Sequence, residues 1–78
     1  MYIHVESHAA REHRARRAVI RLGYSLQRSR RRNPDFPDHG LYRVIDPFQN
    51  QIIVGAWPWD YSLDLDDVES WVAETTLS

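Results

Sequence analysis

The chain contains no cysteine, so neither disulfide bonds nor thiolate-bound metals can hold it together. This absence matters because the chain is only 78 residues long. A domain of this size buries only about 60% of the surface that its unfolded chain exposes, so its hydrophobic core must be thin. We therefore expect one domain, residues 1–78, that is stabilised by the packing of a few large apolar residues.

Charge is distributed unevenly along the sequence, although the formal net charge is only −1. Residues 1–32 contain nine arginines and two glutamates, a net charge of +7, whereas residues 33–78 contain one arginine and nine carboxylates, a net charge of −8. The chain is therefore bipolar along its length. All of its basic residues are arginine, which a GC-rich genome would explain, but such a genome does not explain their clustering.

The first third of the chain predicts a helix. Ser7 is a good N-cap residue, and Gly23 stands where a left-handed residue ends many helices, which predicts a helix over about residues 8–22. Its apolar residues form a narrow stripe at helical spacing, consisting of Ala15, Ala18, Val19 and Leu22. Before this helix, Ile3 and Val5 alternate with polar neighbours, as in a short edge strand or an extended lead-in.

Three later segments have the two-residue period or the β-branched composition of strands. They predict strands over about residues 24–29, 41–46 and 51–56. Pro34 and Pro37 make the segment between the first two strands a loop, because proline cannot donate to a β-ladder. The residues from Asp46 to Asn50 supply turn chemistry, so the second and third strands form a hairpin.

A second helix is predicted over about residues 65–75. Asp64 is the expected N-cap, Asp67 occupies the capping-box position, and Leu63 and Val68 fit a hydrophobic staple. The expected buried face of this helix consists of Leu65, Val68, Trp71 and Val72.

The order of these elements predicts an α+β fold. We expect a two-layer α-β-β-β-α domain in which a three-stranded antiparallel sheet has both helices packed on one face. The other face would carry Ser25, Gln27, Ser29 and one side of the hairpin. It is therefore polar enough to be solvated or to meet a partner.

Four segments of the chain carry a resemblance: RLG at residues 21–23, LQRSRRRNP at 26–34, GLYRVID at 40–46 and SLDLDDVESWV at 62–72. Together they resemble a group of short proteins of unknown function found in actinobacteria and their mycobacteriophages, over roughly residues 15–73. The resemblance implies a bacterial accessory protein or a small phage product that acts on its host. It implies no activity, cofactor or binding residue.

The leading functional feature is a set of arginines in the first helix and the segment after it. Guanidinium groups recognise phosphates through forked hydrogen bonds, and a helix, strand and basic loop could present them along a nucleic-acid backbone. We therefore predict a small regulatory or accessory protein with a nucleic-acid-binding surface formed by Arg14, Arg17, Arg21, Arg28, Arg30, Arg31 and Arg32. This prediction requires one continuous, exposed positive surface. The alternative is a solvated helix face whose arginines pair with the acidic C-terminal helix.

The aromatic segment from Trp57 to Tyr61 is the second feature. Trp57 and Trp59 could stack on unpaired bases or anchor in a pocket of a partner protein. Alternatively, these rings fold back over the thin core. They also support a second functional class, a protein-interaction module. Such a module could be a phage protein that binds and inhibits a host protein, or a homo-oligomer in which positive and negative poles meet.

Other classes of site find no support in the sequence. The acidic run from Asp60 to Glu69 could be a protein-binding patch or imitate nucleic-acid phosphates, but the positive end of a helix dipole explains most of its carboxylates. His4, His8 and His13 lack a further ligand at metal spacing. We therefore expect no metal and no other cofactor. No phosphate-cradling glycine loop, nucleophile elbow or catalytic acid pair is present, so we expect no enzyme. No stretch suits a signal peptide or the roughly 20 apolar residues of a membrane span, so we expect a cytoplasmic protein without a membrane partner, in the host cytosol if phage-encoded.

Overall fold

The structure is a computed structural model that describes residues 7–77. These residues form two helices and a three-stranded antiparallel sheet. In chain order the elements are α1 (His8–Arg21), β1 (Ser25–Arg28), β2 (Tyr42–Asp46), β3 (Gln51–Val54) and α2 (Leu65–Leu77). The predicted α+β fold is confirmed, and the bounds differ from the predicted ones by at most two residues at any end. The predicted role of Ile3 and Val5, and the position of His4, lie outside the described residues.

Helix α1 begins and ends at the residues whose chemistry predicts it. The Oγ atom of Ser7 accepts a hydrogen bond from the amide of Ala10 at 3.1 Å, which caps the N-terminus. The helix ends at Arg21, because Leu22 is the C-cap and Gly23 has a φ angle of +91°. Ala15 and Val19, two residues of the predicted apolar stripe, are buried.

In the sheet, β2 lies between β1 and β3. Val44 of β2 is opposite Leu26 of β1 on one side and Val54 of β3 on the other, so these three residues form an apolar row across the sheet. The register of β2 and β3 shifts between Val44 and Ile45, which leaves Ile53 without a partner residue on β2. This irregularity is a β-bulge in the edge strand.

Gly55 ends β3 two residues earlier than predicted. Its φ angle is +96°, and a Cβ atom built there would lie 2.7 Å from Leu63 Cγ and 3.0 Å from Arg43 Cα. Any other residue type would require a strained φ angle and a shift of Leu63 or of the neighbouring backbone. The chain then returns to the sheet, where Tyr42 and Leu63 exchange backbone hydrogen bonds of 2.7 and 3.0 Å. Residues 56–62, which we call the aromatic loop, are thereby held beside the start of β2.

Reciprocal hydrogen bonds at the start of α2 form the predicted capping box. Asp64 Oδ1 accepts from the Asp67 amide at 2.8 Å, and Asp67 Oδ2 accepts from the Asp64 amide at 3.1 Å. No glycine or proline interrupts the sequence after Asp64, and the helix continues to Leu77, two residues beyond the prediction. Its predicted apolar face is buried or partly buried.

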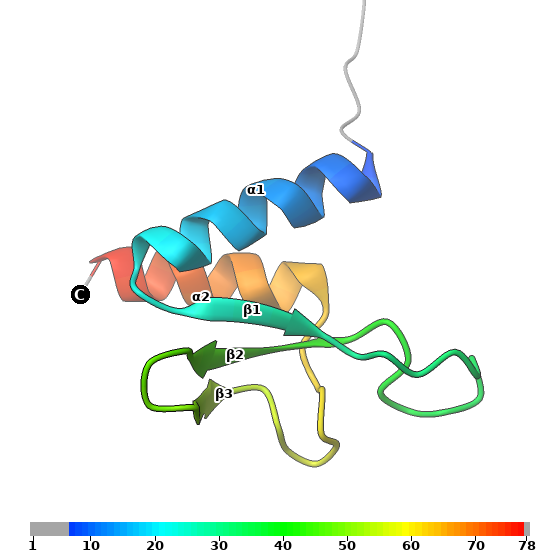
Figure 1. Cartoon of the computed structure of the whole chain (residues 1–78). Coiled ribbons are helices and arrows are strands. Elements are labelled where there is room, and N and C mark those ends of the chain that lie inside the picture. The colour runs from blue at the N-terminus through cyan, green and yellow to red at the C-terminus, as the bar shows by residue number, and fades with distance from the viewer. Residues whose placement is uncertain (1–6, 78) are drawn as a thin grey trace, which may run out of the picture.

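Both helices pack on the same face of the sheet and leave the other face open (Figure 1). In this view α1 lies above β1, α2 lies behind the sheet, and the open face is toward the viewer. The buried core takes residues from both helices and from two strands: Ala15, Val19, Leu26, Tyr42, Val44, Leu65 and Val68. Within residues 7–77, no helix is long and apolar enough to cross a membrane.

Candidate nucleic-acid interface

Three hollows share lining residues, and we call them together the arginine groove. The first hollow has a volume of about 480 Å³ and is lined by Arg16 of α1, three β1 residues, Arg30 and Tyr61. Its β1 residues are Leu26, Gln27 and Arg28. Three arginines, from a helix, a strand and a loop, therefore line one open hollow.

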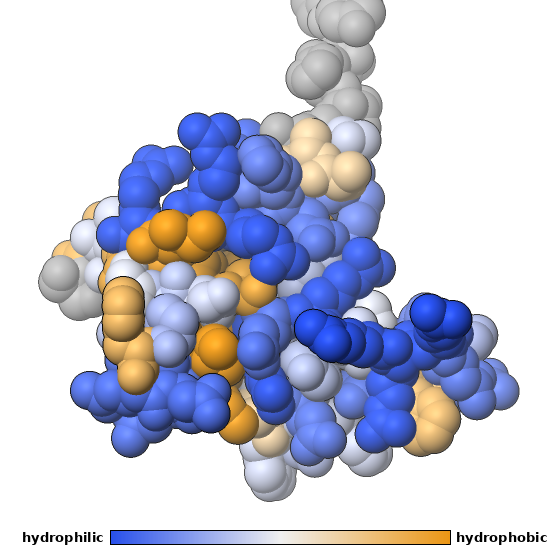
Figure 2. All heavy atoms as spheres, viewed as in Figure 1, coloured by the Kyte–Doolittle hydropathy of each residue, from blue (hydrophilic) through white to orange (hydrophobic). Residues whose placement is uncertain are grey.

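The groove continues from this hollow to aromatic side chains. A second hollow, of about 310 Å³, shares Arg30 and Tyr61 with the first and is also lined by Arg31 and Asp38. A third, of about 330 Å³, shares Arg31 and Asp38 with the second and is lined at its far end by Phe36, Pro58 and Trp59. Figure 2 shows strongly hydrophilic side chains over α1 and over the loop that follows β1, with the most apolar ones nearer the other end of the sheet.

One carboxylate in α1 positions two of the arginines. Glu12 accepts hydrogen bonds from Arg16 Nη2 at 3.1 Å, from Arg28 Nη1 at 3.3 Å and from the Tyr42 hydroxyl at 2.8 Å. Arg16 also donates through Nη1 to the backbone carbonyl of Leu26, on the side of β1 that does not face β2. Arg16 and Arg28 are thus held close together despite their like charge, and they carry one more positive charge than Glu12 neutralises.

This network shifts the pKa values of its two acidic members. Partial burial raises the pKa of Glu12, but the hydrogen bonds from Tyr42 and Arg16 and the charges of Arg28 and Arg16 outweigh burial, so its pKa lies below the usual glutamate value. Burial, followed by the hydrogen bond to Glu12, raises the pKa of Tyr42 to about 12. At neutral pH Glu12 is therefore ionised and Tyr42 is a hydrogen-bond donor.

Arg43 on the open face of the sheet fixes the aromatic loop. Its Nε donates to Gln27 Oε1 at 2.8 Å across the β1–β2 pair, and its guanidinium lies 4.4 Å from the centre of the Tyr61 ring. Its Nη1 also donates to the Asp60 carbonyl at 3.4 Å. Arg43 therefore holds Tyr61 in place where that ring lines the groove.

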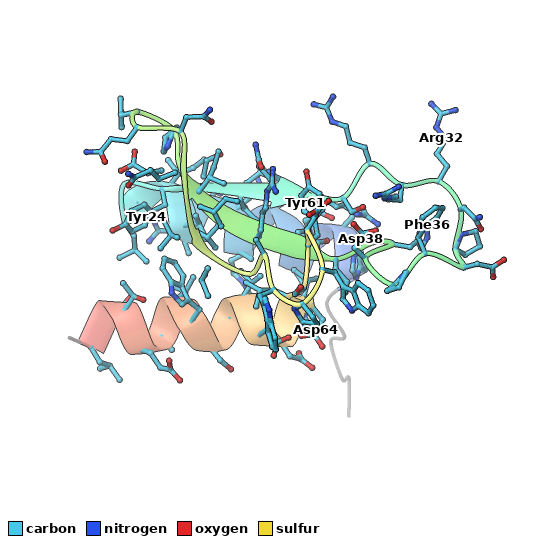
Figure 3. All side chains as sticks on the ribbon, turned by 90° about the horizontal axis from the view of Figure 1, so that it is seen from below. Tyr24, Arg32, Phe36, Asp38, Tyr61 and Asp64 are labelled. Carbon is cyan, nitrogen blue, oxygen red and sulfur yellow. The ribbon has the colours of Figure 1, made fainter. Side chains whose placement is uncertain are left out.

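The loop between β1 and β2, residues 29–41, is held by hydrogen bonds of its own. The Arg31 amide donates to Ser29 Oγ at 3.2 Å, and the Arg31 carbonyl contacts His39 Nδ1 at 2.8 Å. The guanidinium of Arg31 lies 4.4 Å from the centre of the Phe36 ring. Arg32, by contrast, is exposed and projects to the side of the sheet opposite α2 (Figure 3).

The seven predicted arginines do not form one continuous surface. Arg28, Arg30 and Arg31 line the groove, and Arg32 adjoins them on the loop. Arg17 and Arg21 are exposed and stand two residues before and after the buried Val19, which puts them on the outer face of α1. Arg14 lines a separate hollow between α1 and α2 that also contains Glu69.

Arg11 pairs with the acidic C-terminal helix, as the alternative interpretation of the arginines expected. Its Nη2 lies 2.7 Å from Asp66 Oδ1 and 2.6 Å from Glu69 Oε1. The hydrogen bonds that Arg11 donates to Glu69 and, second in size of effect, to Asp66 raise the pKa of this arginine above its usual value. Arg11 therefore joins α1 to α2 and is not part of the groove.

The two predicted tryptophans have different surroundings. Trp59 is about half exposed and lines the third hollow, whereas Trp57 is 85% exposed and lines none of the three hollows. The alternative that both rings cover the core does not hold for Trp57. Three residues that matter to the groove were missed from the sequence: Arg16, Asp38 and Arg43. Only Arg16 had a usable signal, since it stands four residues after Glu12.

No group of three histidine, aspartate or glutamate side chains within residues 7–77 is placed to hold a metal ion. In comparisons with known proteins, the chain matches no family model, and no curated protein or solved structure is significantly similar to it. The resemblance to short actinobacterial and mycobacteriophage proteins therefore stays a prediction.

Proposed function

We propose that this protein is a small accessory protein that binds single-stranded nucleic acid in the arginine groove. The observation that carries the proposal is the hollow of about 480 Å³ surrounded by Arg16, Arg28 and Arg30. Guanidinium groups on three separate elements suit the phosphates of an extended backbone better than one isolated anion. The hydrogen bonds of Arg16 and Arg28 to Glu12 reduce the side-chain entropy that binding would otherwise remove.

The aromatic end of the groove favours a single strand over a duplex. Phe36, Trp59 and Tyr61 line its second and third hollows. Stacking of one base on an aromatic ring contributes about 1–3 kcal/mol, and only unpaired bases have free faces for it. In this arrangement the arginines at one end of the groove contact phosphates, and the aromatic rings at the other end stack on bases.

The salt dependence of binding to a single-stranded oligonucleotide tests this proposal. If the three arginines of the first hollow each contact one phosphate, log affinity falls with log salt concentration at a slope of about −2, because each phosphate contributes about −0.7. Replacing Arg28 and Arg30 with glutamine is expected to reduce the slope to less than half and to weaken binding severely.

The matched control replaces Arg17 and Arg21 with glutamine. It removes the same two charges, but from the outer face of α1, where the groove does not reach. The control is expected to keep nearly the wild-type affinity. Equal losses in the two double variants would show that total charge and not the groove controls binding, and the proposal would then fail.

A second candidate, a protein-interaction module, is favoured by the apolar surface around β3. Phe48 is 90% exposed, Trp57 is 85% exposed and Ile52 is 52% exposed. No charged residue occurs between Asp46 and Asp60, in a chain of which 27% is charged. Large exposed apolar side chains in and beside one edge strand are a feature of protein interfaces. We propose self-association through this surface as the alternative function.

A further inference from the structure

One buried carboxylate in the arginine groove is incompletely satisfied. Asp38 is 5% exposed, and its Oδ1 atom has no hydrogen-bond partner among the described residues. Arg31 Nε lies 3.4 Å from this oxygen, which makes an ion pair but not a hydrogen bond. The negative charge is therefore balanced while the acceptor is left unused, and buried acceptors of this kind are uncommon in proteins.

This carboxylate adjoins open space between aromatic rings. Asp38 lines both the second and the third hollow, and the third has a volume of about 330 Å³. A water molecule takes about 30 Å³ of liquid, so this hollow has room for a ring system. Phe36 lines it from one loop and Trp59 from the other. Figure 3 shows Asp38 between Phe36 and Tyr61.

Arg31 occupies the position that a ligand would take. Its guanidinium lies 4.4 Å from the centre of the Phe36 ring, and its Nε lies 3.4 Å from the covered oxygen of Asp38. A guanine base has the same two properties, a flat π-face and adjacent N–H donors at N1 and N2. We propose that the third hollow is a nucleobase pocket selective for guanine. The base displaces Arg31 from Phe36 and donates from N1 and N2 to Asp38, and Arg31 then pairs with a phosphate. This inference rests on the proposed function.

Two arginines beside the pocket favour a base on a phosphate backbone over a side chain of a partner protein. Arg30 and Arg31 line the second hollow, which shares Arg31, Asp38 and Asp60 with the third. These arginines attract the phosphates that flank a base, whereas a peptide supplies no phosphate for them. Because the pocket has two carboxylates, Asp38 and Asp60, a peptide guanidinium is the competitor that the test must include.

The test compares three ten-nucleotide DNA strands at one low salt concentration, with binding measured by fluorescence anisotropy. One strand is all thymidine, and the other two carry a single central guanosine or inosine. Guanosine is expected to raise the affinity of the wild type about tenfold over the all-thymidine strand. Inosine lacks the 2-amino group, so it is expected to give a smaller gain. These arms need no variant and do not depend on the folding of one.

The variant arm compares Asp38→Asn with Asp35→Asn. Both substitutions remove one negative charge from the same loop, but Asp35 is exposed and lines none of the three hollows. Asp38→Asn is expected to abolish the preference for guanosine and to retain binding of the all-thymidine strand. Asp35→Asn is expected to keep the preference in full.

The possible failures can be told apart. If the all-thymidine strand binds and guanosine adds nothing, the pocket inference is overturned and the proposed function stands. If no strand binds at low salt, the proposed function fails and the pocket inference fails with it. If N-acetylarginine amide competes with the guanosine strand as well as free guanosine monophosphate does, the pocket takes a peptide guanidinium and the inference is also overturned.

Discussion

Glu12 is the residue on which the geometry of the groove depends most. Its carboxylate accepts from Arg16, Arg28 and Tyr42, which belong to α1, β1 and β2. A sequence shows the contact to Arg16, because acidic and basic residues four positions apart share a helix face. It does not show the contacts to Arg28 and Tyr42, which stand 16 and 30 positions away and come close only when β1 and β2 pair.

Replacing Glu12 with glutamine is expected to remove part of the dependence of stability on pH. The pKa of Glu12 in the folded protein lies below its ordinary value of 4.5, so the ionised form stabilises the fold above that pH. This contribution is lost as the pH falls through the lower, folded-state pKa. Urea denaturation at pH values from 7 to about 3 measures the effect.

The difference in unfolding free energy between the wild type and Glu12→Gln is expected to narrow as the solution is acidified. Asp35→Asn serves as the control, since Asp35 is an exposed carboxylate of the loop. A difference that stays constant down to pH 3 would show that Glu12 contributes through packing and not through its charge.

At the scale of secondary structure, the sequence predicted the helix N-caps. It did not predict where β3 bulges or where the chain after β3 packs back against the sheet. Ser7 and Asp64 have side chains that satisfy helix N-termini locally, so their positions predict where α1 and α2 begin. The bulge at Ile53 and the close approach of Gly55 to Leu63 depend on contacts between segments that meet only in the folded protein. For the same reason, the positions of the arginines in the sequence of α1 did not reveal which of them lie beside β1.

Replacing Asp64 with alanine is expected to destabilise the protein by about 1 kcal/mol, because the Asp67 amide loses its acceptor at 2.8 Å. Asp64→Asn is the matched control, since asparagine keeps an oxygen acceptor at the N-cap. It is expected to retain most of the stability in urea denaturation. If alanine and asparagine had the same effect, the charge of Asp64 near the helix dipole would matter more than its hydrogen bond.

At the scale of the molecule, the exposed surface around β3 predicts self-association. Sedimentation velocity is expected to show a concentration-dependent rise in the mean mass of the wild type. Replacing both Phe48 and Trp57 with serine is expected to abolish that rise, because these side chains are 90% and 85% exposed. Leu77→Ser is the control: this residue is 88% exposed but lies at the far end of α2. A wild type that stays monomeric at all concentrations would contradict the prediction.

The candidate site was predicted in part. The clustering of arginine in residues 1–32 includes Arg28, Arg30 and Arg31, which line the proposed groove because consecutive residues of a strand and loop stay close in space. It also includes Arg17 and Arg21, which lie outside the groove because helical rotation turns them away from the sheet. Asp38 and Arg43 carry no distinguishing pattern in the sequence. They gain their roles from Arg31, Gln27 and Tyr61, which only the fold brings to them.

Arg32 and Asp64 project to opposite sides of the sheet, and the first turn of α2 adds Asp66 and Asp67 to the side of Asp64 (Figure 3). The charges at these positions on the two sides of the sheet are therefore of opposite sign, whereas the arginines of α1 lie on the same side as α2. If the proposed function holds, the carboxylates in the first turn of α2 face away from a nucleic acid bound beside Arg32 and repel a second strand near that end of the helix.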